Sequence, residues 1–273
     1  MSLLSIENLR VTFPSDHGPV EVVRGLSFDL GLERLGIVGE SGSGKSMTGR
    51  AIMGLIPPPG HVSADRLEFD GIDLRNLSEA DMRQMRGARM SMVLQDPKFS
   101  LNPVIRIGEQ IEEAMTVHSA CDPGERRQRM LDALRAVRID NPERVAKLYP
   151  HEVSGGMGQR VMIAMMVVME PALMIADEPT SALDVSVRGQ VLHILGDLVQ
   201  RRGMGLILIS HDLNMVARWC DRILVMFQGK IVEELGSGEL YKARHPYTRG
   251  LVASLPRIDE DRTRLPVLDR GAL

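Results

Sequence analysis

Short apolar runs separated by polar or glycine-rich turns fill the first third of the chain and predict strands. These runs are Leu3 to Phe13, Val20 to Leu30, Leu35 to Val38, Arg66 to Phe69 and Met90 to Gln95. The run from Leu35 to Val38 is apolar throughout, which is typical of a buried strand. Helices are expected over Met47 to Ile56 and near Ser78 to Gly87. This part of the chain therefore predicts a strand-rich lobe that contains two helices.

From Asp96 to His151 the pattern changes to a helical period. One helix face would hold Ile107, Ile111, Ala114, Met115 and His118. Pro123 opens a second helix, and Asn141-Pro142 caps a third. The second helix has its apolar positions at Met130, Leu131, Leu134 and Val137. We therefore expect a helical subdomain, at about 96–160, that is inserted in the core.

The core pattern then resumes and continues almost to the end of the chain. An apolar helix is expected from Val161 to Met169, and two buried strands are expected at Leu173 to Ala176 and Leu206 to Ile209. An amphipathic helix between these strands carries Val191, Leu195, Leu198 and Val199. A hairpin is expected across Gln228-Gly229. The chain divides into a main domain, 1–235, and a tail, 236–273.

Composition narrows the class of protein. With 273 residues, of which 44% are hydrophobic and 25% charged, the chain can bury one large α/β core with a smaller insertion, and we expect a soluble globular protein. The net charge of −3 gives no electrostatic reason to expect nucleic acid as a partner. Met1 to Phe13 includes polar residues and predicts a first strand, not a signal peptide. The longest apolar stretch, Val161 to Met169, is far shorter than the roughly twenty residues that cross a bilayer, so membrane contact would come through partners.

The sulfur-containing residues do not predict a metal centre. Cys121 and Cys220 stand alone without C-x-x-C spacing, so neither a zinc site nor an iron–sulfur site is indicated, and we interpret both as reduced thiols of a cytosolic protein. The densest methionine group lies on a predicted helix, where packing is the default role. That group is Met162, Met165, Met166 and Met169.

A glycine-rich segment, Gly39 to Ser46, reads GESGSGKS and fits the phosphate-binding pattern G-x-x-x-x-G-K-[ST]. It follows a predicted buried strand and precedes a predicted helix, as that loop requires. Glycines let backbone N–H groups and the helix N-terminus face a phosphate. Lys45 would reach the β- and γ-phosphates, and the Ser46 hydroxyl would bind Mg²⁺. The alternative is an ordinary Gly/Ser-rich turn, which the strand and helix on either side disfavour.

A second segment, Val153 to Arg160, reads VSGGMGQR and predicts another anion-binding helix N-terminus. Ser154 is a good N-cap, and Gly155 and Gly156 leave backbone N–H groups uncovered. Since no second lysine-bearing loop lies nearby, the phosphate would belong to the nucleotide of another subunit. By itself, this segment fits a capped core helix equally well.

Acidic and histidine side chains follow the later buried strands. Asp177 and Glu178 end the strand that begins at Leu173, and the carboxyl end of a parallel strand is where open α/β sheets bind ligands. Asp177 would hold Mg²⁺ through water, and Glu178 would polarise an attacking water. His211 follows the strand from Leu206 to Ile209; a lone histidine is usually structural, but this position favours a γ-phosphate contact.

Together these segments resemble the nucleotide-binding domain of ATP-binding cassette (ABC) transporters, over nearly the whole chain. In order, the motifs are Walker A at Gly39 to Ser46, the Q-loop at Gln95, the signature at Ser154 to Gln159, Walker B at Leu173 to Glu178, the D-loop at Ser181 to Asp184 and the switch histidine at His211. The resemblance implies an α/β P-loop NTPase fold: a RecA-like core with a parallel sheet, an N-terminal antiparallel β-subdomain and the inserted helical subdomain. It also implies ATP and Mg²⁺ as ligands.

The resemblance assigns roles to individual residues. The residues expected to contact ATP are Phe13, Gly39, Glu40, Ser41, Gly42, Ser43, Gly44, Lys45, Ser46, Met47, Ser154, Gly155, Gly156, Gln159 and Asp184. Those expected to act in hydrolysis are Lys45, Gln95, Glu178 and His211, and those expected to hold Mg²⁺ are Ser46, Gln95 and Asp177. Phe13 would stack on adenine; the alternative is a buried core phenylalanine. Gln95 would link the metal site to the helical subdomain, and the loop from Asp96 to Arg106 would dock a membrane partner.

Three further segments resemble one subgroup, the ATPases of bacterial peptide and nickel importers. They are Gln95 to Pro103, Leu148 to Val153, and His245 to Leu251 with Leu255-Pro256. In this subgroup two different ATPases commonly pair beneath two membrane permease subunits, on the cytoplasmic face of the inner membrane, and an extracytoplasmic solute-binding protein supplies the solute.

Two features depart from the subgroup. The tail from Arg257 to Leu273 lacks the cysteine cluster that many peptide-importer ATPases carry, so no iron–sulfur cluster is expected and a nickel-type or other small-solute system gains weight. Met157 replaces the glutamine that many signatures have, which leaves Ser154 and the glycine backbone available for phosphate.

Three other classes of protein share part of this pattern. An ABC protein of DNA repair would carry a coiled-coil or zinc insertion, a translation-factor ABC protein would hold two cassettes, and a P-loop kinase or GTPase would lack the signature and the Walker B constellation. The transported solute stays open, because an ATPase subunit does not contact it.

Overall fold

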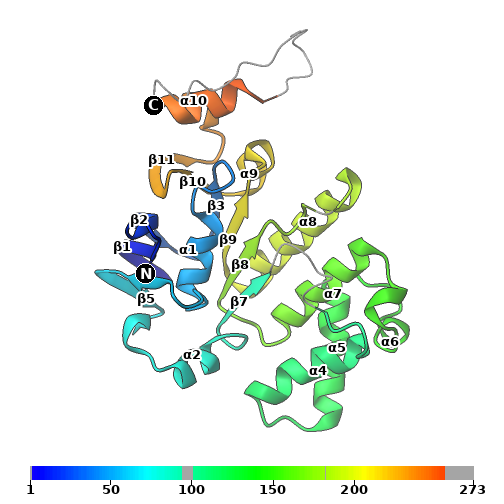
Figure 1. Ribbon diagram of the computed structural model, residues 1–273. Coiled ribbons are helices and arrows are strands. Elements are labelled where there is room, and N and C mark those ends of the chain that lie inside the picture. The colour runs from blue at the N-terminus through cyan, green and yellow to red at the C-terminus, as the bar shows by residue number, and fades with distance from the viewer. Residues whose placement is uncertain (1, 94–100, 182, 256–273) are drawn as a thin grey trace. The chain divides into compact units, whose positions relative to one another are not determined.

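The computed structural model describes residues 2–93, 101–181 and 183–255, which fall into two compact units (Figure 1). The first unit joins the described residues up to Arg75 with those from Ile207 onward, and the second runs from Asn76 to Leu206. Helices combine with antiparallel and parallel strands, so the chain has the α/β fold that the sequence predicts. The predicted boundaries, 1–235 for the domain, about 96–160 for its helical insertion and 236–273 for the tail, stay predictions.

The first unit contains an antiparallel sheet built from its earliest strands. The first part of this unit contains, in chain order, β1 (Leu4–Phe13), β2 (Val20–Leu30), β3 (Arg34–Val38), α1 (Lys45–Ile52), β4 (His61–Ser63), β5 (Arg66–Phe69) and β6 (Ile72–Asp73), followed by a 3-10 turn (Leu74–Asn76). The strand order is β2-β1-β5-β6, with β4 also paired to β1. Buried and exposed positions alternate along the second half of β2, which shows that one face of this sheet meets the core.

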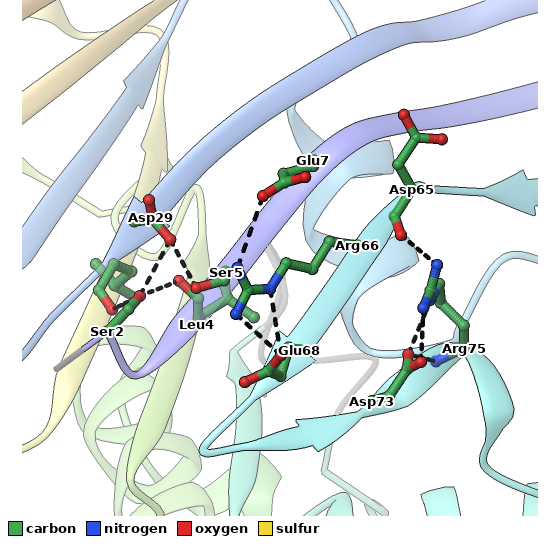
Figure 2. A network of polar contacts seen from close by, with 11 residues as sticks. Ser2, Leu4, Ser5, Glu7, Asp29, Asp65, Arg66, Glu68, Asp73 and Arg75 are labelled. Atoms are coloured by element: carbon green, nitrogen blue, oxygen red, sulfur yellow. Dashed lines mark hydrogen bonds and ion pairs between the residues drawn. The ribbon is translucent and has the colours of Figure 1, made fainter.

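Polar side chains link the strands of this sheet (Figure 2). The Ser5 hydroxyl donates to Asp29 across the β1–β2 pair at 2.6 Å, and Arg66 bonds to Glu68 on its own strand at 3.1 Å. Arg75 pairs with Asp73 at 2.7 Å and also donates to the Asp65 carbonyl. Arg66 also pairs with Glu7 at 3.6 Å, which joins β5 to β1. These contacts are mostly exposed, so each contributes little to stability.

A second sheet in this unit follows the order β11-β10-β3-β9. The elements of the returning chain are β9 (Gly205–Ser210), α9 (Leu213–Trp219), β10 (Arg222–Phe227), β11 (Lys230–Gly236), a 3-10 turn (Leu240–Lys242) and α10 (Pro246–Ala253). Strands β3 and β10 are parallel, and β10 and β11 form an antiparallel hairpin. Its turn residues Gln228 and Gly229 both have positive φ, at 47° and 81°, which confirms the predicted hairpin.

The second unit is mainly helical. Its elements are α2 (Glu79–Met85), β7 (Met90–Val93), α4 (Ile107–His118), α5 (Pro123–Ala136), α6 (Pro142–Val145), a 3-10 turn (Pro150–Glu152), α7 (Gly155–Val167), β8 (Leu173–Asp177) and α8 (Val185–Arg202). Helices α4, α5 and α7 pack on one another, as Figure 1 shows in green, and strands β7 and β8 pair in parallel. The predicted apolar faces are confirmed, since Ile111, Met115 and Leu134 are fully buried. Of the four methionines predicted to pack on α7 and just after it, Met162 is fully buried, and Met165, Met166 and Met169 are half-buried.

Two details of the predicted helices were wrong. Helix α1 begins at Lys45 and ends at Ile52, whereas the sequence predicted Met47 to Ile56. It stops early because Gly54 adopts a left-handed φ of 60° and Leu55 N–H bonds back to the Arg50 carbonyl at 2.7 Å, the hydrogen bond of a Schellman motif. Helix α9 was not predicted, because only Leu213 and Val216 among its seven residues are buried and its period is weak.

Within the described parts of the chain, no helix is both long enough and apolar enough to cross a bilayer.

Candidate nucleotide site

The loop from Gly39 to Ser46 leaves buried strand β3 and enters α1, as the sequence predicted. Gly44 forms the N-cap of α1 with a left-handed φ of 101°. A Cβ atom at Gly39 would stand 2.2 Å from the Met226 carbonyl, and one at Gly44 would stand 2.6 Å from the Val22 carbonyl. Glycine is therefore required at both positions by backbone that approaches the loop from β2 and β10.

Lys45 is folded back into this loop. Its ammonium donates to the carbonyls of Gly39 and Glu40, both at 2.8 Å, and lies 3.4 Å from the Ser43 hydroxyl. The residue is only 6% exposed. A buried ammonium is tolerated only when hydrogen bonds replace its hydration, and here backbone carbonyls do so. The loop therefore folds around one positive charge, and this charge can attract a phosphate.

A cavity of about 170 Å³ lies against the loop. It is lined by Glu40, Ser41, Gly42, Ser43, Phe227 and Gln228. The hairpin turn supports the loop from this side, since Gly229 N–H donates to the Ser43 carbonyl at 3.0 Å. Ser46 and Met47 lie in the first turn of α1 and are half-buried.

Phe13 and His211 belong to the same unit as the loop. Phe13 ends β1 and is half-buried, with its ring so close to Gly60 that a Cβ there would stand 2.6 Å from the ring edge. It is not among the fully covered core side chains. His211 is exposed and directly follows β9, a neighbour of β3 in the sheet. The Asp212 side chain caps α9 beside it by accepting from Met215 N–H at 3.0 Å.

In the second unit, the signature segment starts helix α7. Ser154 is the N-cap, and its hydroxyl accepts from Met157 N–H at 3.3 Å. Ser154 and Gly155 are exposed, and a Cβ at Gly155 would meet nothing within 4 Å. The N-terminus of this 13-residue helix is therefore uncovered within its unit and presents backbone N–H groups.

The signature also contacts the start of α8. A Cβ at Gly156 would stand 2.6 Å from the Val187 side chain, and Val187 N–H is capped by Asp184 at 3.0 Å. The structure thus brings two predicted segments together, the signature and the D-loop. Gln159, unlike the exposed Ser154 and Gly155, is buried: it is 1% exposed, and its side-chain NH₂ has no hydrogen-bond partner.

Asp177 and Glu178 end β8 with different exposures. Asp177 is 5% exposed and Glu178 is half-buried. Glu178 has a positive φ of 50°, a conformation that costs a non-glycine residue about 1–3 kcal/mol and often marks a functional position. Its carbonyl accepts from the Ser181 N–H at 3.2 Å and from the Ser181 hydroxyl at 3.1 Å, which hold this turn in place.

The predicted site residues are therefore divided between the units. The first contains the phosphate-binding loop, Phe13 and His211, and the second contains the signature, Asp177, Glu178 and Asp184. Gln95, the loop from residue 96 to 100 and the tail beyond Leu255 lie outside the described residues.

One residue beside the loop was missed by the sequence analysis. Tyr247, on α10, accepts a hydrogen bond from Glu40 N–H at 2.9 Å. The segment from His245 to Leu251 had been noted as a subgroup feature, but no local pattern indicates that its tyrosine would reach a loop 207 positions earlier.

Comparisons with known proteins show which family this chain belongs to. The family model for the ABC transporter matches residues 23–181. The dipeptide transport ATP-binding protein DppD of Escherichia coli is 46% identical over 270 residues, which cover 98% of this chain and 83% of that protein. The oligopeptide transport ATP-binding protein OppD of Bacillus subtilis is 44% identical over 271 residues, which cover 97% of this chain and 76% of that protein.

Solved structures give the same fold. The ATP-binding cassette MJ0796, in a dimeric post-hydrolysis state bound to ADP and Pi, matches with a TM-score of 0.75 and 27% identity, over 85% of this chain and 98% of that one. The cbiO1 structure from Clostridium perfringens, part of an ABC transporter complex, matches with a TM-score of 0.76 and 26% identity, over 88% and 91%. With the family model and both relatives in agreement, the chain belongs to the ABC transporter family and is an ATPase of that family.

Proposed function

We propose that this protein is the ATP-hydrolysing subunit of a bacterial importer of peptides. The observation that supports this proposal most directly is that the loop from Gly39 to Ser46 closes around the Lys45 ammonium, which would offer a bound phosphate a positive charge already in position. The peptide substrate class is favoured because the two relatives compared above are named for dipeptide and oligopeptide transport.

ATP binding would use the first unit. On arrival of the nucleotide, the three N–H donors of Lys45 would turn in part from the Gly39 and Glu40 carbonyls to β- and γ-phosphate oxygens, which are stronger acceptors because they are charged. The loop amides from Ser41 to Met47 would surround the phosphates, while the Glu40 N–H stays bonded to the Tyr247 hydroxyl. The half-exposed ring of Phe13 would be available for stacking on adenine.

Mg²⁺ fits the oxygen donors that the sequence predicts for it. The candidate ligands are the Ser46 hydroxyl, the Asp177 carboxylate and the side chain of Gln95, of which Asp177 is buried. No cluster of three or more His, Cys, Asp or Glu side chains that could hold a metal occurs in the described residues. That suits Mg²⁺, which usually takes one or two protein ligands and completes its shell with nucleotide phosphates and water. The ion would neutralise phosphate charge.

Hydrolysis would depend on Glu178 and His211. Glu178 would accept a proton from the attacking water, and its left-handed backbone would help to aim the carboxylate. The exposed His211 would contact the γ-phosphate. Most of the rate would come from positioning and charge stabilisation, as is usual in phosphoryl transfer.

A second ATPase subunit would complete each site. The exposed helix N-terminus at Ser154 and Gly155 would cap a nucleotide bound to the partner, with Asp184 next to it. A dimeric cassette among the structural matches supports pairing of this kind. We propose a different, related ATPase as the partner, two membrane permease subunits above the pair, and an extracytoplasmic solute-binding protein. The complex would place this chain on the cytoplasmic face of the inner membrane.

The assembled importer tests this function. We expect ATP hydrolysis by the reconstituted complex to rise when its binding protein is loaded with peptide, and Glu178→Gln to reduce hydrolysis at least a hundredfold while ATP still binds. The partner's own site is disabled in this measurement. Glu125→Gln is the matched control, since Glu125 is exposed on α5.

Two results would contradict the proposal. Wild-type turnover by the Glu178→Gln complex would exclude the catalytic role of that carboxylate. Stimulation by a nickel chelate, and not by dipeptides or oligopeptides, would exclude the peptide substrate class while leaving the ATPase function standing.

A further inference from the structure

Helix α10 brings a buried aromatic side chain to the phosphate-binding loop. Tyr247 is fully buried, and its ring packs on Phe227 with the ring centroids 4.3 Å apart. Phe227 in turn lines the cavity beside Glu40 to Ser43. A tyrosine in such a position is held by packing, so its hydroxyl has a fixed location.

That hydroxyl contacts a single peptide group of the loop. The peptide between Gly39 and Glu40 donates its N–H to Tyr247 Oη at 2.9 Å, and its carbonyl accepts from Lys45 Nζ at 2.8 Å. One peptide unit is therefore held at both ends, by Tyr247 on one side and by the phosphate-binding lysine on the other.

Helix α10 is itself anchored to β11, the second strand of the hairpin. The Glu233 carboxylate on β11 accepts from Arg244 N–H at 2.6 Å and from His245 N–H at 3.3 Å. His245 then caps the helix, since its Nδ1 accepts from Tyr247 N–H at 3.2 Å. These bonds fix the first turn of α10, which carries Tyr247.

We propose that Tyr247 is a positioning residue of the ATP site, which holds the Gly39–Glu40 peptide in the orientation that aims its carbonyl at Lys45 and away from the bound phosphates. This inference rests on the proposed ATP-binding role of the loop. It makes α10 a working part of the nucleotide site, although the helix begins 200 positions after the loop ends.

The physical reason lies in the polarity of a peptide group. A peptide released from Tyr247 can rotate, and rotation would bring a carbonyl oxygen toward the phosphate oxygens that the loop must attract. The loop would then spend part of its time in a form that repels nucleotide, and the apparent affinity would fall in proportion. Because Tyr247 does not touch the reacting atoms, KM for ATP would change more than kcat.

Tyr247→Phe is the direct test, because it keeps the packed ring and removes only the hydroxyl. Loss of one hydrogen bond predicts nucleotide binding about three- to tenfold weaker, as measured by titration with a fluorescent ATP analogue. Tyr241→Phe is the matched control: it removes a hydroxyl from the same segment, but Tyr241 is 76% exposed. Lys45→Ala serves as the reference for a damaged phosphate site.

Hydrogen exchange separates positioning from a general loss of structure. Without nucleotide, the backbone amide hydrogen of Glu40 should exchange faster in Tyr247→Phe than in wild type or in Tyr241→Phe. The urea unfolding midpoints of the three proteins should stay close to one another. Glu233→Ala should give the same change in smaller measure, since it loosens α10 and leaves the hydroxyl in place.

The outcomes distinguish this inference from the function on which it rests. If Lys45→Ala bound nucleotide like wild type, the proposed ATP site would be wrong. If Lys45→Ala weakened binding but Tyr247→Phe matched wild type in affinity and in loop exchange, the role of Tyr247 would be wrong. Rapid exchange of the Glu40 amide in the wild-type protein would also overturn it, whatever the variants do.

Discussion

The reactivity of single residues in this chain depends on how deeply they are buried. Cys220 closes α9 and is 2% exposed, and burial raises the pKa of its thiol to about 12, despite the nearby Arg34 charge that lowers it. Because this pKa lies above that of an unfolded cysteine, the buried neutral thiol contributes stability below about pH 8.5, and the contribution is lost as pH rises through about 12. Cys121, in contrast, is half-buried.

The two thiols should therefore differ in reactivity. At pH 8 we expect iodoacetamide to modify Cys121 in the native protein and to leave Cys220 untouched, since almost no thiolate forms at Cys220. In denaturant both should react. Mass spectrometry of the wild type and of Cys121→Ser gives the number of modified cysteines directly. Equal rates for Cys220 in the native and denatured protein would contradict the burial described above.

At the scale of elements, α9 packs so closely on β3 that the strand requires a glycine. A Cβ at Gly36 would stand 2.1 Å from the Val216 side chain and 3.1 Å from the Cys220 sulfur. Val216 is fully buried and has little room to move. Gly36→Ala should lower the free energy of unfolding by about 1–3 kcal/mol, the usual cost of overpacking.

Urea unfolding tests this contact, with Gly31→Ala as the control, because a Cβ at Gly31 meets nothing within 4 Å. Adding Val216→Ala to the Gly36→Ala variant should recover part of the loss, since it makes room for the new methyl group. The effects of the two changes would then not be additive. A Gly36→Ala protein as stable as Gly31→Ala would show that α9 can shift freely on β3.

At the scale of the whole molecule, the exposed start of α7 predicts an incomplete enzyme. Since Ser154 and Gly155 would serve a nucleotide on another chain, the purified protein should be largely monomeric and weakly active. Light scattering should detect a dimer when the second ATPase and ATP are added to the Glu178→Gln variant, which traps the nucleotide.

Two substitutions at Ser154 test the proposed contact with phosphate separately from helix capping. Asp and Asn are both good N-caps, so each keeps α7 intact, but only Ser154→Asp places a negative charge where the phosphate would lie. We expect Ser154→Asp to prevent the trapped dimer and Ser154→Asn to allow it. A stable homodimer that drives the membrane subunits without a second ATPase would refute the heterodimer and leave the ATP site unaffected.

The sequence alone determined the features that depend on neighbouring residues. Strands β1, β2, β3, β5, β8 and β9 start and end within one residue of the prediction, because their apolar runs are bounded by clear turns. The loop at Gly39 and the cap at Ser154 were predicted for the same reason, since glycine and N-cap preferences act within a few residues. The ends of α1 and the existence of α9 depended on a Schellman turn and a weak period, and these were missed.

Only the tertiary structure decided which distant parts support the loop. Tyr247 reaches Glu40 across 207 positions, Gly229 bonds to Ser43 from the hairpin, and Gly36 is required by a helix that begins 177 residues later. A local sequence pattern cannot predict such contacts, because it indicates that a side chain is buried but not which residues surround it. The sequence determined the glycine-rich loop between β3 and α1, since the shape of that loop depends on residues that are neighbours in the chain. Packing decided what holds it in shape, since close contact is made between segments that are adjacent only in the folded chain.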